Sequence, residues 1–365
     1  MPTDILYLLR QRVYIIFSLG CVNREILSKD RIMTNTNDKN LHQIRAGRVT
    51  LSSNVILAPL AGITDYPFRK IASGYGPGLT VTEMISARAL CHGNMKTTRM
   101  ATPGIDEHMV SVQLFGANPQ HMKDAAIICQ NLGAPMIDIN MGCPQKKIIK
   151  SGAGAALMKT PELAAAIVEA IASGVNVPVT VKIRLGWDSR SINAPEFAHL
   201  MEDAGASMIT VHARTKTQMF GGNTDWKAIR SVKESVKIPV VANGDILSVQ
   251  DAEQCLMESG ADGVMIGRGA LGRPWFLRQV ADYLSGNQEL FQPDLRHVSK
   301  TIDQHLELID RYYSEPASTW MFRKHLAWYT KGMKHSAMFR DTLFRVAGIE
   351  NLKALKKDFF ETFQD

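Results

Sequence analysis

The hydrophobic positions of this chain gather, from residue 54 onward, into short runs that recur at regular intervals. Each run is rich in β-branched residues, ends in a polar or glycine-containing cluster, and is followed by a stretch with helical character. Several runs are apolar on successive residues, which is typical of parallel strands buried on both faces. The eight runs are residues 54–60, 79–84, 109–116, 136–143, 177–186, 208–215, 238–246 and 263–270.

The stretches between these runs carry signals for helix starts. Asn118 and Thr160 each precede a proline, and Ser248 precedes an apolar periodic stretch. Eight strand–helix units predict the α/β class and a (β/α)8 TIM barrel. A doubly wound open sheet is the main alternative, but an unbroken series over about 230 residues fits the usual barrel size better.

The strand–helix rhythm stops after the eighth unit and gives way to three helical stretches. Residues 297–314 and 319–331 each place apolar side chains on one helical face, and residues 351–363 form a last helical stretch. We therefore expect the barrel to occupy residues 46–284 and a small all-helical C-terminal domain to occupy residues 285–365.

The residues before the repeating pattern form a separate segment. We expect residues 1–45 to be an extension that is disordered or foreign to the native protein, with Met33 as an alternative start. Residues 13–22 are apolar and could mimic the core of a signal peptide, but a membrane span needs about 18–20 apolar residues. Because the rest of the chain is typical of a cytoplasmic protein, we expect a cytoplasmic location and no membrane partner.

Composition narrows the class of protein further. The chain has 365 residues, 45% of them hydrophobic and 21% charged, which excludes a disordered, collagen-like or coiled-coil protein. Its five cysteines form no C-x-x-C pair and leave one unpaired, which argues against a disulfide framework and a zinc ribbon. We expect no metal site. The net charge of +7 favours an anionic partner.

Polar residues stand at the ends of the predicted strands, where barrels collect their chemistry. Together they supply amide, amine, imidazole, thiol and guanidinium groups on one face, a set that stability alone does not explain. These residues include Glu83, Gln113, Asn140, Cys143, Lys182, Arg184, His212, Arg214, Asn243, Asp245 and Arg268.

Cys143 follows the fourth strand and precedes a proline. A thiol near its ordinary pKa of about 8.5 is mostly protonated at neutral pH, so it can act as a general acid. Inert packing is the alternative role for a buried cysteine. We expect the gap before the fifth strand to hold a mobile loop whose three lysines face outward toward substrate phosphates, namely Lys146, Lys147 and Lys150.

Lys182 lies within an apolar run, so we expect its side chain to point into the barrel mouth. It could form a Schiff base, serve as a fixed cation beside a reduced flavin, or extend to the rim.

Two glycine clusters invite different interpretations. Residues 267–272 spell G-x-G-x-x-G, but no further strand follows, as a dinucleotide-binding fold requires. They fit better as a phosphate cradle after the last barrel strands, with Arg268 adding charge. Residues 152–154 are expected to form a flexible loop.

Seven ordered motifs give the chain a specific resemblance to a known family. The sequence resembles the tRNA-dihydrouridine synthases, most of all the bacterial B-type branch, from about residue 46 to the C-terminus. RKHLAWYTKG at 323–332 extends the likeness into the helical domain. One motif departs, because the family's usual P-M-x-G reads Pro59-Leu60-Ala61-Gly62. The seven motifs are LAPLAGITDYPFR, VQLFG, DINMGCP, VTVKIRLGW, TVHART, VANGDI and IGRGALGRPW.

This resemblance implies an FMN-containing barrel that uses NADPH to reduce the C5–C6 double bond of particular uridines in tRNA. Cys143 would protonate C5 while the reduced flavin delivers hydride to C6. Asn140 would position the base, and we add Arg184 as a substrate contact. The implied FMN contacts are Pro59, Leu60, Ala61, Gln113, Lys182 and His212 at the ring, and Asn243, Gly244, Asp245, Gly267 and Arg268 at the ribityl phosphate end.

The positive charge is concentrated near the C-terminus. Residues 316–357 hold nine basic and two acidic residues, whereas residues 46–315 hold 26 of each. A basic C-terminal region beside a neutral barrel is suited to binding the phosphates of tRNA. We expect one helical stripe to contact tRNA through Arg323, Lys331 and Lys334, with Trp320, Trp328 and Tyr329 interleaved.

Two other functions compete with this one. An FMN barrel that reduces a small pyrimidine, of the dihydroorotate dehydrogenase kind, would not need a basic helical appendage. An RNA-binding barrel without catalysis would not need Cys143, Lys182 and the phosphate loop. We expect a monomer; the modified uridine and the choice between NADPH and NADH stay open.

Overall fold

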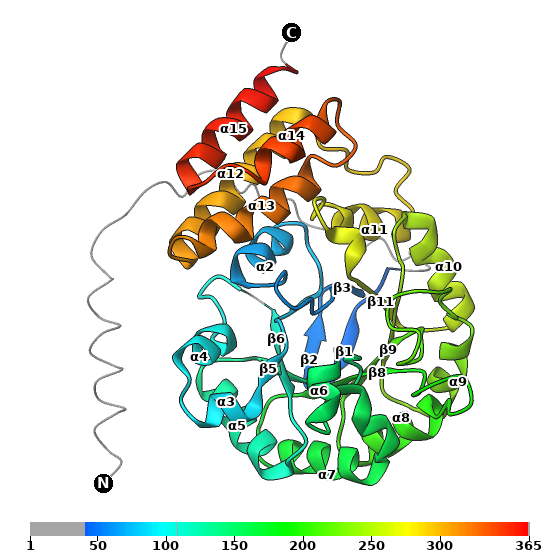
Figure 1. Cartoon of the computed structure of the whole chain (residues 1–365). Coiled ribbons are helices and arrows are strands. Elements are labelled where there is room, and N and C mark those ends of the chain that lie inside the picture. Colours follow the sequence, from blue (N-terminus) through cyan, green and yellow to red (C-terminus); the bar gives the residue numbers. More distant parts are fainter. Residues whose placement is uncertain (1–40, 108, 364–365) are drawn as a thin grey trace. The chain divides into compact units, whose positions relative to one another are not determined.

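The computed structural model describes residues 41–107 and 109–363 (Figure 1). Eight parallel strands at the centre of this part close into a barrel, because each strand pairs with the next and the eighth pairs with the first. This confirms the predicted TIM barrel and excludes the open sheet. The strands are β3 (Val55–Leu57), β4 (Leu79–Val81), β6 (Val110–Phe115), β7 (Met136–Asn140), β8 (Val179–Arg184), β9 (Met208–His212), β10 (Val240–Asn243) and β11 (Gly263–Ile266).

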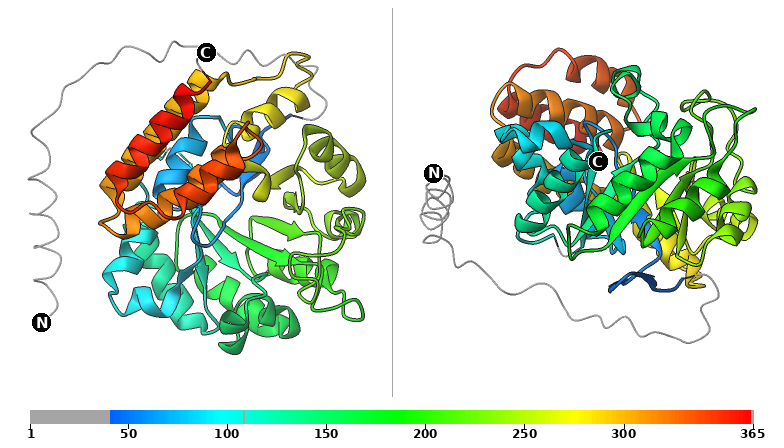
Figure 2. Two further views of the ribbon diagram at one scale, coloured as in Figure 1. Left: turned by 45° about the horizontal axis from the view of Figure 1, so that its top comes forward. Right: turned by 90° about the horizontal axis from the view of Figure 1, so that it is seen from below.

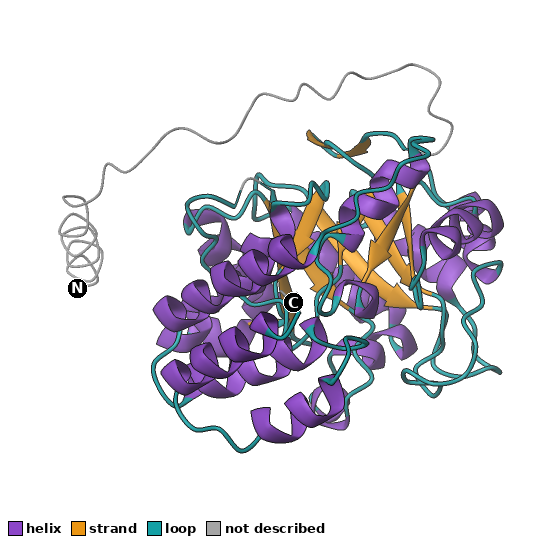
Figure 3. Ribbon diagram, turned by 90° about the horizontal axis from the view of Figure 1, so that it is seen from above, coloured by secondary structure: helices purple, strands orange, loops and turns teal. Residues whose placement is uncertain are grey.

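Helices surround the barrel (Figures 1 and 3), and a short strand β5 (Ile85–Ser86) pairs with the carboxyl end of β6. Two of the predicted starts are capped by side chains. Asn118 accepts from the His121 N–H, and Ser248 forms a capping box with Asp251. The helices are α2 (Tyr66–Ser73), α3 (Ala87–Cys91), α4 (Met95–Ala101), α5 (Pro119–Asn131), α6 (Lys146–Lys150), α7 (Pro161–Ala172), α8 (Ala194–Asp203), α9 (Ala228–Ser235), α10 (Val249–Ser259) and α11 (Phe276–Leu284).

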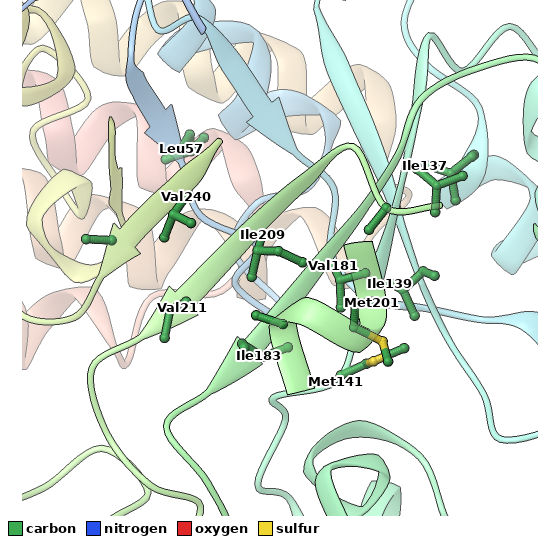
Figure 4. Packing of buried hydrophobic residues seen from close by; sticks show 14 of the residues in the cluster. Leu57, Ile137, Ile139, Met141, Val181, Ile183, Met201, Ile209, Val211 and Val240 are labelled. Carbon is green, nitrogen blue, oxygen red and sulfur yellow. The ribbon is translucent and has the colours of Figure 1, made fainter. Parts of the chain in front are cut away.

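Alternation along each strand divides the barrel into two cores. On β7 and β8, Ile137, Ile139, Val181 and Ile183 face the surrounding helices and join the main apolar cluster, in which they lie near Met201 of α8 (Figure 4). The intervening residues point into the barrel and are apolar only near the strands' amino ends. This division leaves the carboxyl ends free to carry polar side chains.

A hairpin closes the amino end of the barrel. Strands β1 (Ile44–Ala46) and β2 (Val49–Leu51) pair antiparallel, and their buried side chains pack on the inner apolar cluster with Met136, Met208 and Met265 (Figure 3). The hairpin starts at Ile44, so the expected boundary at residue 46 falls inside it. The expected disorder of residues 1–40 lies outside the described residues.

The C-terminal region contains four helices where three were predicted (Figure 2). The three predicted stretches are confirmed as α12 (Leu295–Tyr312), α13 (Ala317–Tyr329) and α15 (Ile349–Glu361). The fourth helix, α14 (Ser336–Leu343), was not predicted.

These four helices share one apolar core, to which Trp275 of the barrel also contributes. Gly272, at φ +69°, lets the loop after β11 approach α13 closely, because a Cβ atom there would lie 2.2 Å from the Trp328 carbonyl carbon. The last glycine of the G-x-G-x-x-G run therefore serves this contact.

The segment after Cys143 contains two short helices, joined by a turn at the predicted loop of residues 152–154. Helix α6 leads through a turn into the 3-10 helix η2 (Gly154–Lys159). Gly152 and Gly154 adopt left-handed conformations in this turn, at φ +76° and +62°. Gly154 lies so close to the chain before it that a Cβ atom would stand 2.8 Å from the Cys143 carbonyl oxygen.

Candidate active site

One cavity of about 490 Å³ opens at the carboxyl ends of the strands. Fourteen residues predicted from the sequence line it. They are Pro59, Leu60, Ala61, Gln113, Asn140, Cys143, Lys182, Arg184, His212, Asn243, Gly244, Asp245, Gly267 and Arg268.

Cys143 lies half-buried at the cavity wall, just beyond β7. Burial raises the pKa of its thiol, and the bond from the Gln145 N–H and the charges of Arg184 and Lys182 offset only part of this effect. The thiol therefore keeps its proton at neutral pH and can donate it. The three lysines of α6 are exposed, as expected, and none of them acts on this pKa.

A set of buried polar side chains forms the floor of the cavity. Gln113 donates to Asp138 at 2.6 Å, Asn140 donates to Gln113 at 2.8 Å, and the Cys143 N–H donates to Asn140 at 2.9 Å. Thr180 donates to the second carboxylate oxygen of Asp138 at 2.5 Å. Burial raises the pKa of Asp138 to about 6. Sequence reasoning did not single out Asp138 or Thr180.

Lys182 points into the cavity, as predicted. Its ammonium group donates to the Asn243 side-chain oxygen at 2.9 Å, and the Asn243 amide donates in turn to the Met265 carbonyl at 2.8 Å. Burial lowers the pKa of Lys182 to about 8, with the charge of Arg184 adding to the effect. Because both ends of its amide are engaged, Asn243 orients Lys182.

Four cations surround His212 and keep it neutral. Burial lowers its pKa well below the ordinary value, and the charges of Lys182, Arg184, Arg214 and Arg268 lower it further. The Arg184 guanidinium braces two strand ends by donating to the carbonyls of Gly142 and Thr215 at 2.7 and 2.8 Å.

Asp245 neutralises part of this positive charge. Its carboxylate forms ion pairs with both Arg214 and Arg268, and these bonds hold its pKa below the ordinary value against the cost of burial. Since a carboxylate repels phosphate, Asp245 can serve a phosphate only by holding these arginines. Gly244, at φ +129°, leaves room where a Cβ atom would lie 2.9 Å from Thr224 and 3.0 Å from His212.

The segment Pro59–Ile63 forms another wall and is held from two sides. The Gly62 N–H donates to Glu83, and Lys324 of α13 donates to the Gly62 carbonyl. The C-terminal helices therefore contact the cavity wall directly.

Several wall residues were not predicted, and two of them, Phe220 and Leu247, present large apolar side chains from loops that follow strands. Phe220 is half exposed and stands 5.6 Å from the Arg184 guanidinium, and Leu247 is similarly exposed. The only sequence signal for either residue is its position a few residues beyond a predicted strand.

The expected tRNA stripe is not one helical face. Arg323 is half-buried on α13 and donates to the Val346 carbonyl, whereas Lys331 and Lys334 are exposed beyond the end of that helix. Tyr329 was expected at the surface, but it is buried and bonds to His305 at 3.2 Å. Trp320 is exposed.

Comparisons with known proteins agree with this geometry. A family model described as "Dihydrouridine synthase (Dus)" matches residues 56–364. A "Probable tRNA-dihydrouridine synthase" of Rickettsia conorii is 45% identical over 298 residues, which cover 81% of this chain and 90% of the relative. A "tRNA-dihydrouridine synthase B" of Xanthomonas axonopodis pv. citri is 42% identical over 318 residues, covering 87% and 96%.

Among solved structures, histamine dehydrogenase from Rhizobium sp. 4-9 has a TM-score of 0.54 at 14% identity, over 75% of this chain and 51% of that one. This likeness shows the fold alone, and the chain spans about half the length of that protein.

No helix in the described part of the chain is long and apolar enough to cross a membrane. From the family model and the two relatives, we conclude that the chain belongs to the dihydrouridine synthase family.

Proposed function

We propose that this protein is a cytoplasmic, monomeric enzyme that reduces uridines in tRNA to 5,6-dihydrouridine, with FMN as its cofactor and NADPH as the electron donor. The observation that carries the proposal is the half-buried Cys143 thiol, whose pKa burial raises, at the wall of a cavity lined by Lys182, Arg184 and Arg268. The relatives named tRNA-dihydrouridine synthases support tRNA as the substrate.

The cavity residues fit an FMN molecule. Three cations line the cavity, Lys182, Arg184 and Arg268, and Asp245 is its one carboxylate among the described residues. This balance leaves positive charge for a phosphate and for a flavin ring that becomes anionic on reduction. We assign the phosphate to Gly267 and Arg268, the ring to Lys182 and Gln113, and one ring face to the segment Pro59–Ala61. FMN would supply the hydride that reaches C6 of the uracil.

The protein's own part in the reaction is to orient the base and to supply a proton. Cys143 donates the proton to C5, and a thiol with a raised pKa holds that proton until it is needed. Asn140 and Arg184, which flank Cys143 in the cavity, contact the base. His212 stays neutral, so it can accept or donate one hydrogen bond without adding charge.

A uracil must leave its stack in tRNA to reach this cavity, so the enzyme needs a grip on the backbone outside it. We propose that Lys331 and Lys334 contribute to that grip, and that Arg323 acts mainly by bracing the loop before α15. A small pyrimidine substrate would leave this basic surface without a role.

Flavin spectroscopy tests the proposal. The purified protein should be yellow, should bleach on addition of NADPH, and should regain its colour with unmodified tRNA but not with free uridine or orotate. Cys143→Ala should keep the spectrum and the bleaching while losing uridine reduction by on the order of a hundredfold or more, the usual range for a lost general acid. A protein that binds no flavin, or a variant that modifies tRNA normally, would refute it.

A further inference from the structure

We propose that Asp138 is a positioning residue for Cys143, acting through a directional chain of hydrogen bonds across the cavity floor. The carboxylate fixes which end of the Gln113 amide faces it. Gln113 then fixes the orientation of Asn140, and Asn140 holds the Cys143 backbone. The inference rests on the proposed role of Cys143 as the proton donor.

The chain has a single direction because a carboxylate can only accept hydrogen bonds. Facing Asp138, Gln113 must present its NH2 group, so its oxygen faces Asn140. Asn140 must then present its NH2 group to Gln113, which turns its own oxygen toward the Cys143 N–H. A flip of either amide would bring two donors together.

The fold places these groups side by side through strand register. Gln113 of β6 pairs with Asp138 of β7, and Asp138 pairs with Thr180 of β8, so the three side chains share one layer inside the barrel. Asp138 is 3% exposed and Gln113 is 1% exposed. Asp138 is also not among the residues that line the cavity, so a hydrogen bond lost at its carboxylate is costly.

Cys143 is held through both of its backbone polar groups. Its N–H donates to Asn140, and its carbonyl accepts from the Ala155 N–H at 3.1 Å. Loss of the first bond would free the residue to rotate away from the base, while the apolar walls of the barrel would stay in place. The expected consequence is a misplaced thiol in a folded protein.

Orientation can be separated from charge with two conservative substitutions. In Asp138→Asn the new amide can still accept from Gln113 with its oxygen, because its NH2 group can donate to the Thr180 hydroxyl, which then acts as an acceptor. In Thr180→Val, Asp138 still accepts from Gln113. Each single variant should therefore keep Cys143 in place.

The double variant Asp138→Asn/Thr180→Val should lose the fixed direction of these hydrogen bonds. Without the Thr180 hydroxyl, the new amide at position 138 can present either its oxygen or its NH2 group to Gln113. We expect kcat for uridine reduction to fall about tenfold, the ratio that one lost hydrogen bond represents, with KM for tRNA unchanged. Alkylation of Cys143 by iodoacetamide, followed by peptide mass spectrometry, should change by a similar factor. Asp138→Asn/Thr210→Val is the matched control, because Thr210 is buried one strand further along and belongs to no bond of this chain.

The outcomes separate clearly. A loss in the double variant well beyond the product of the two single effects, with the Thr210 control behaving like Asp138→Asn alone, supports the inference. If Asp138→Asn alone is as impaired as the double variant, the charge of Asp138 matters and the inference is wrong. Additive effects also overturn it. The alkylation readout needs no tRNA, so it decides the question even if the proposed activity fails.

Thr180→Val alone provides a second measurement if the double variant does not fold. A protonated carboxyl group has one donor and one acceptor, as an amide group has. The pKa of Asp138 is about 6, and Lys182 is the charged group that acts on it. Below pH 6, Thr180→Val should therefore behave like the double variant. The ratio of Cys143 alkylation in Thr180→Val to that in the unaltered protein should be near one at pH 8 and should change about tenfold below pH 6. A ratio that does not vary with pH would overturn the inference.

Discussion

Two buried polar regions of this molecule are built by opposite rules. On the cavity floor, Asp138 and the two amides beside it are joined in one chain of hydrogen bonds. In the joint between α2 and the C-terminal helices, which we define as Phe68, His305, His325 and Tyr329, two imidazole rings lie 4.5 Å apart. His305 bonds to Tyr329, but the other three ring nitrogens have no partner among residues 41–107 and 109–363.

The difference shows two ways in which a fold buries polar groups. Pairing stabilises the floor and gives it direction, so its polar groups can position a reacting residue. The joint avoids charge instead: burial lowers the pKa of His305 to about 3 and that of His325 well below its ordinary value, with the charge of Lys324 acting in the same sense. The floor should therefore be sensitive to lost partners, and the joint to acid.

The largest expected effect is the removal of the floor's acceptor. Asp138→Leu keeps the approximate volume but leaves the Gln113 NH2 group and the Thr180 hydroxyl buried without a partner. We expect the free energy of unfolding to fall by about 3 kcal/mol, since each unsatisfied buried group costs roughly 1–3 kcal/mol. Urea denaturation at pH 7 measures it. A loss below about 1 kcal/mol would mean that the floor tolerates unpaired groups as the joint does.

The same type of substitution should have the opposite effect in the joint. His325→Leu removes two unpaired ring nitrogens that lie beside Phe68, at a ring distance of 5.4 Å. We expect the free energy of unfolding to rise by about 1–2 kcal/mol at pH 7, because the removed groups had no bond to lose. Urea denaturation of both proteins checks the sign, and a destabilised variant would contradict the view that these nitrogens are buried without partners.

Acid should widen the difference in stability between His325→Leu and the unaltered protein. The histidines are neutral in the folded protein but titrate near 6.5 when unfolded, so the stability that they contribute is complete above pH 6.5 and is lost as the pH falls toward 3. Between pH 6 and pH 4, the unaltered protein should lose about 1.4 kcal/mol per pH unit more than His325→Leu. The difference between the two proteins cancels the opposing contribution of Asp65, whose pKa burial raises to about 6.

The sequence predicted the strands and the residues at their ends because those signals are local. Runs of apolar residues mark strands that are buried on both faces, and the residue after each run must lie at the carboxyl edge of the barrel. Fourteen cavity residues followed from this rule and the family motifs. The chain from Asp138 to Cys143 did not, because Gln113 and Thr180 lie 25 and 42 residues from Asp138 and meet it only through register.

The C-terminal region was predicted less well for a related reason. Whether an aromatic residue on an amphipathic helix contacts RNA or the protein core depends on which neighbour covers it. Tyr329 looked like part of a basic surface, but it lies buried inside the joint, and its hydroxyl bonds to His305. Helix α14 has eight residues, and the burial of Phe339 and Leu343 against the shared core stabilises it. Neither contact can be read from local spacing.

The smallest expected effect distinguishes two glycines that the sequence presents as equivalent. Gly152 and Gly154 both have left-handed backbones, so alanine at either position should cost about 1–2 kcal/mol of stability. A Cβ at Gly152 would meet only the Ala117 methyl group at 3.3 Å, whereas one at Gly154 would press on the Cys143 carbonyl at 2.8 Å.

Gly154→Ala should therefore lower kcat for uridine reduction while NADPH still bleaches the flavin, and Gly152→Ala should leave kcat unchanged. Gly154→Ala should also lose more stability, because its Cβ would lie 2.9 Å from Ile148 as well. The two variants share the left-handed backbone and differ in the contact with Cys143, so steady-state kinetics on unmodified tRNA, together with urea denaturation, shows what that contact contributes. Equal kcat values would show that Cys143 tolerates a displaced carbonyl. Of its two backbone bonds, the one that the Cys143 N–H donates to Asn140 would then control its placement, which would assign the position of the thiol to the cavity floor.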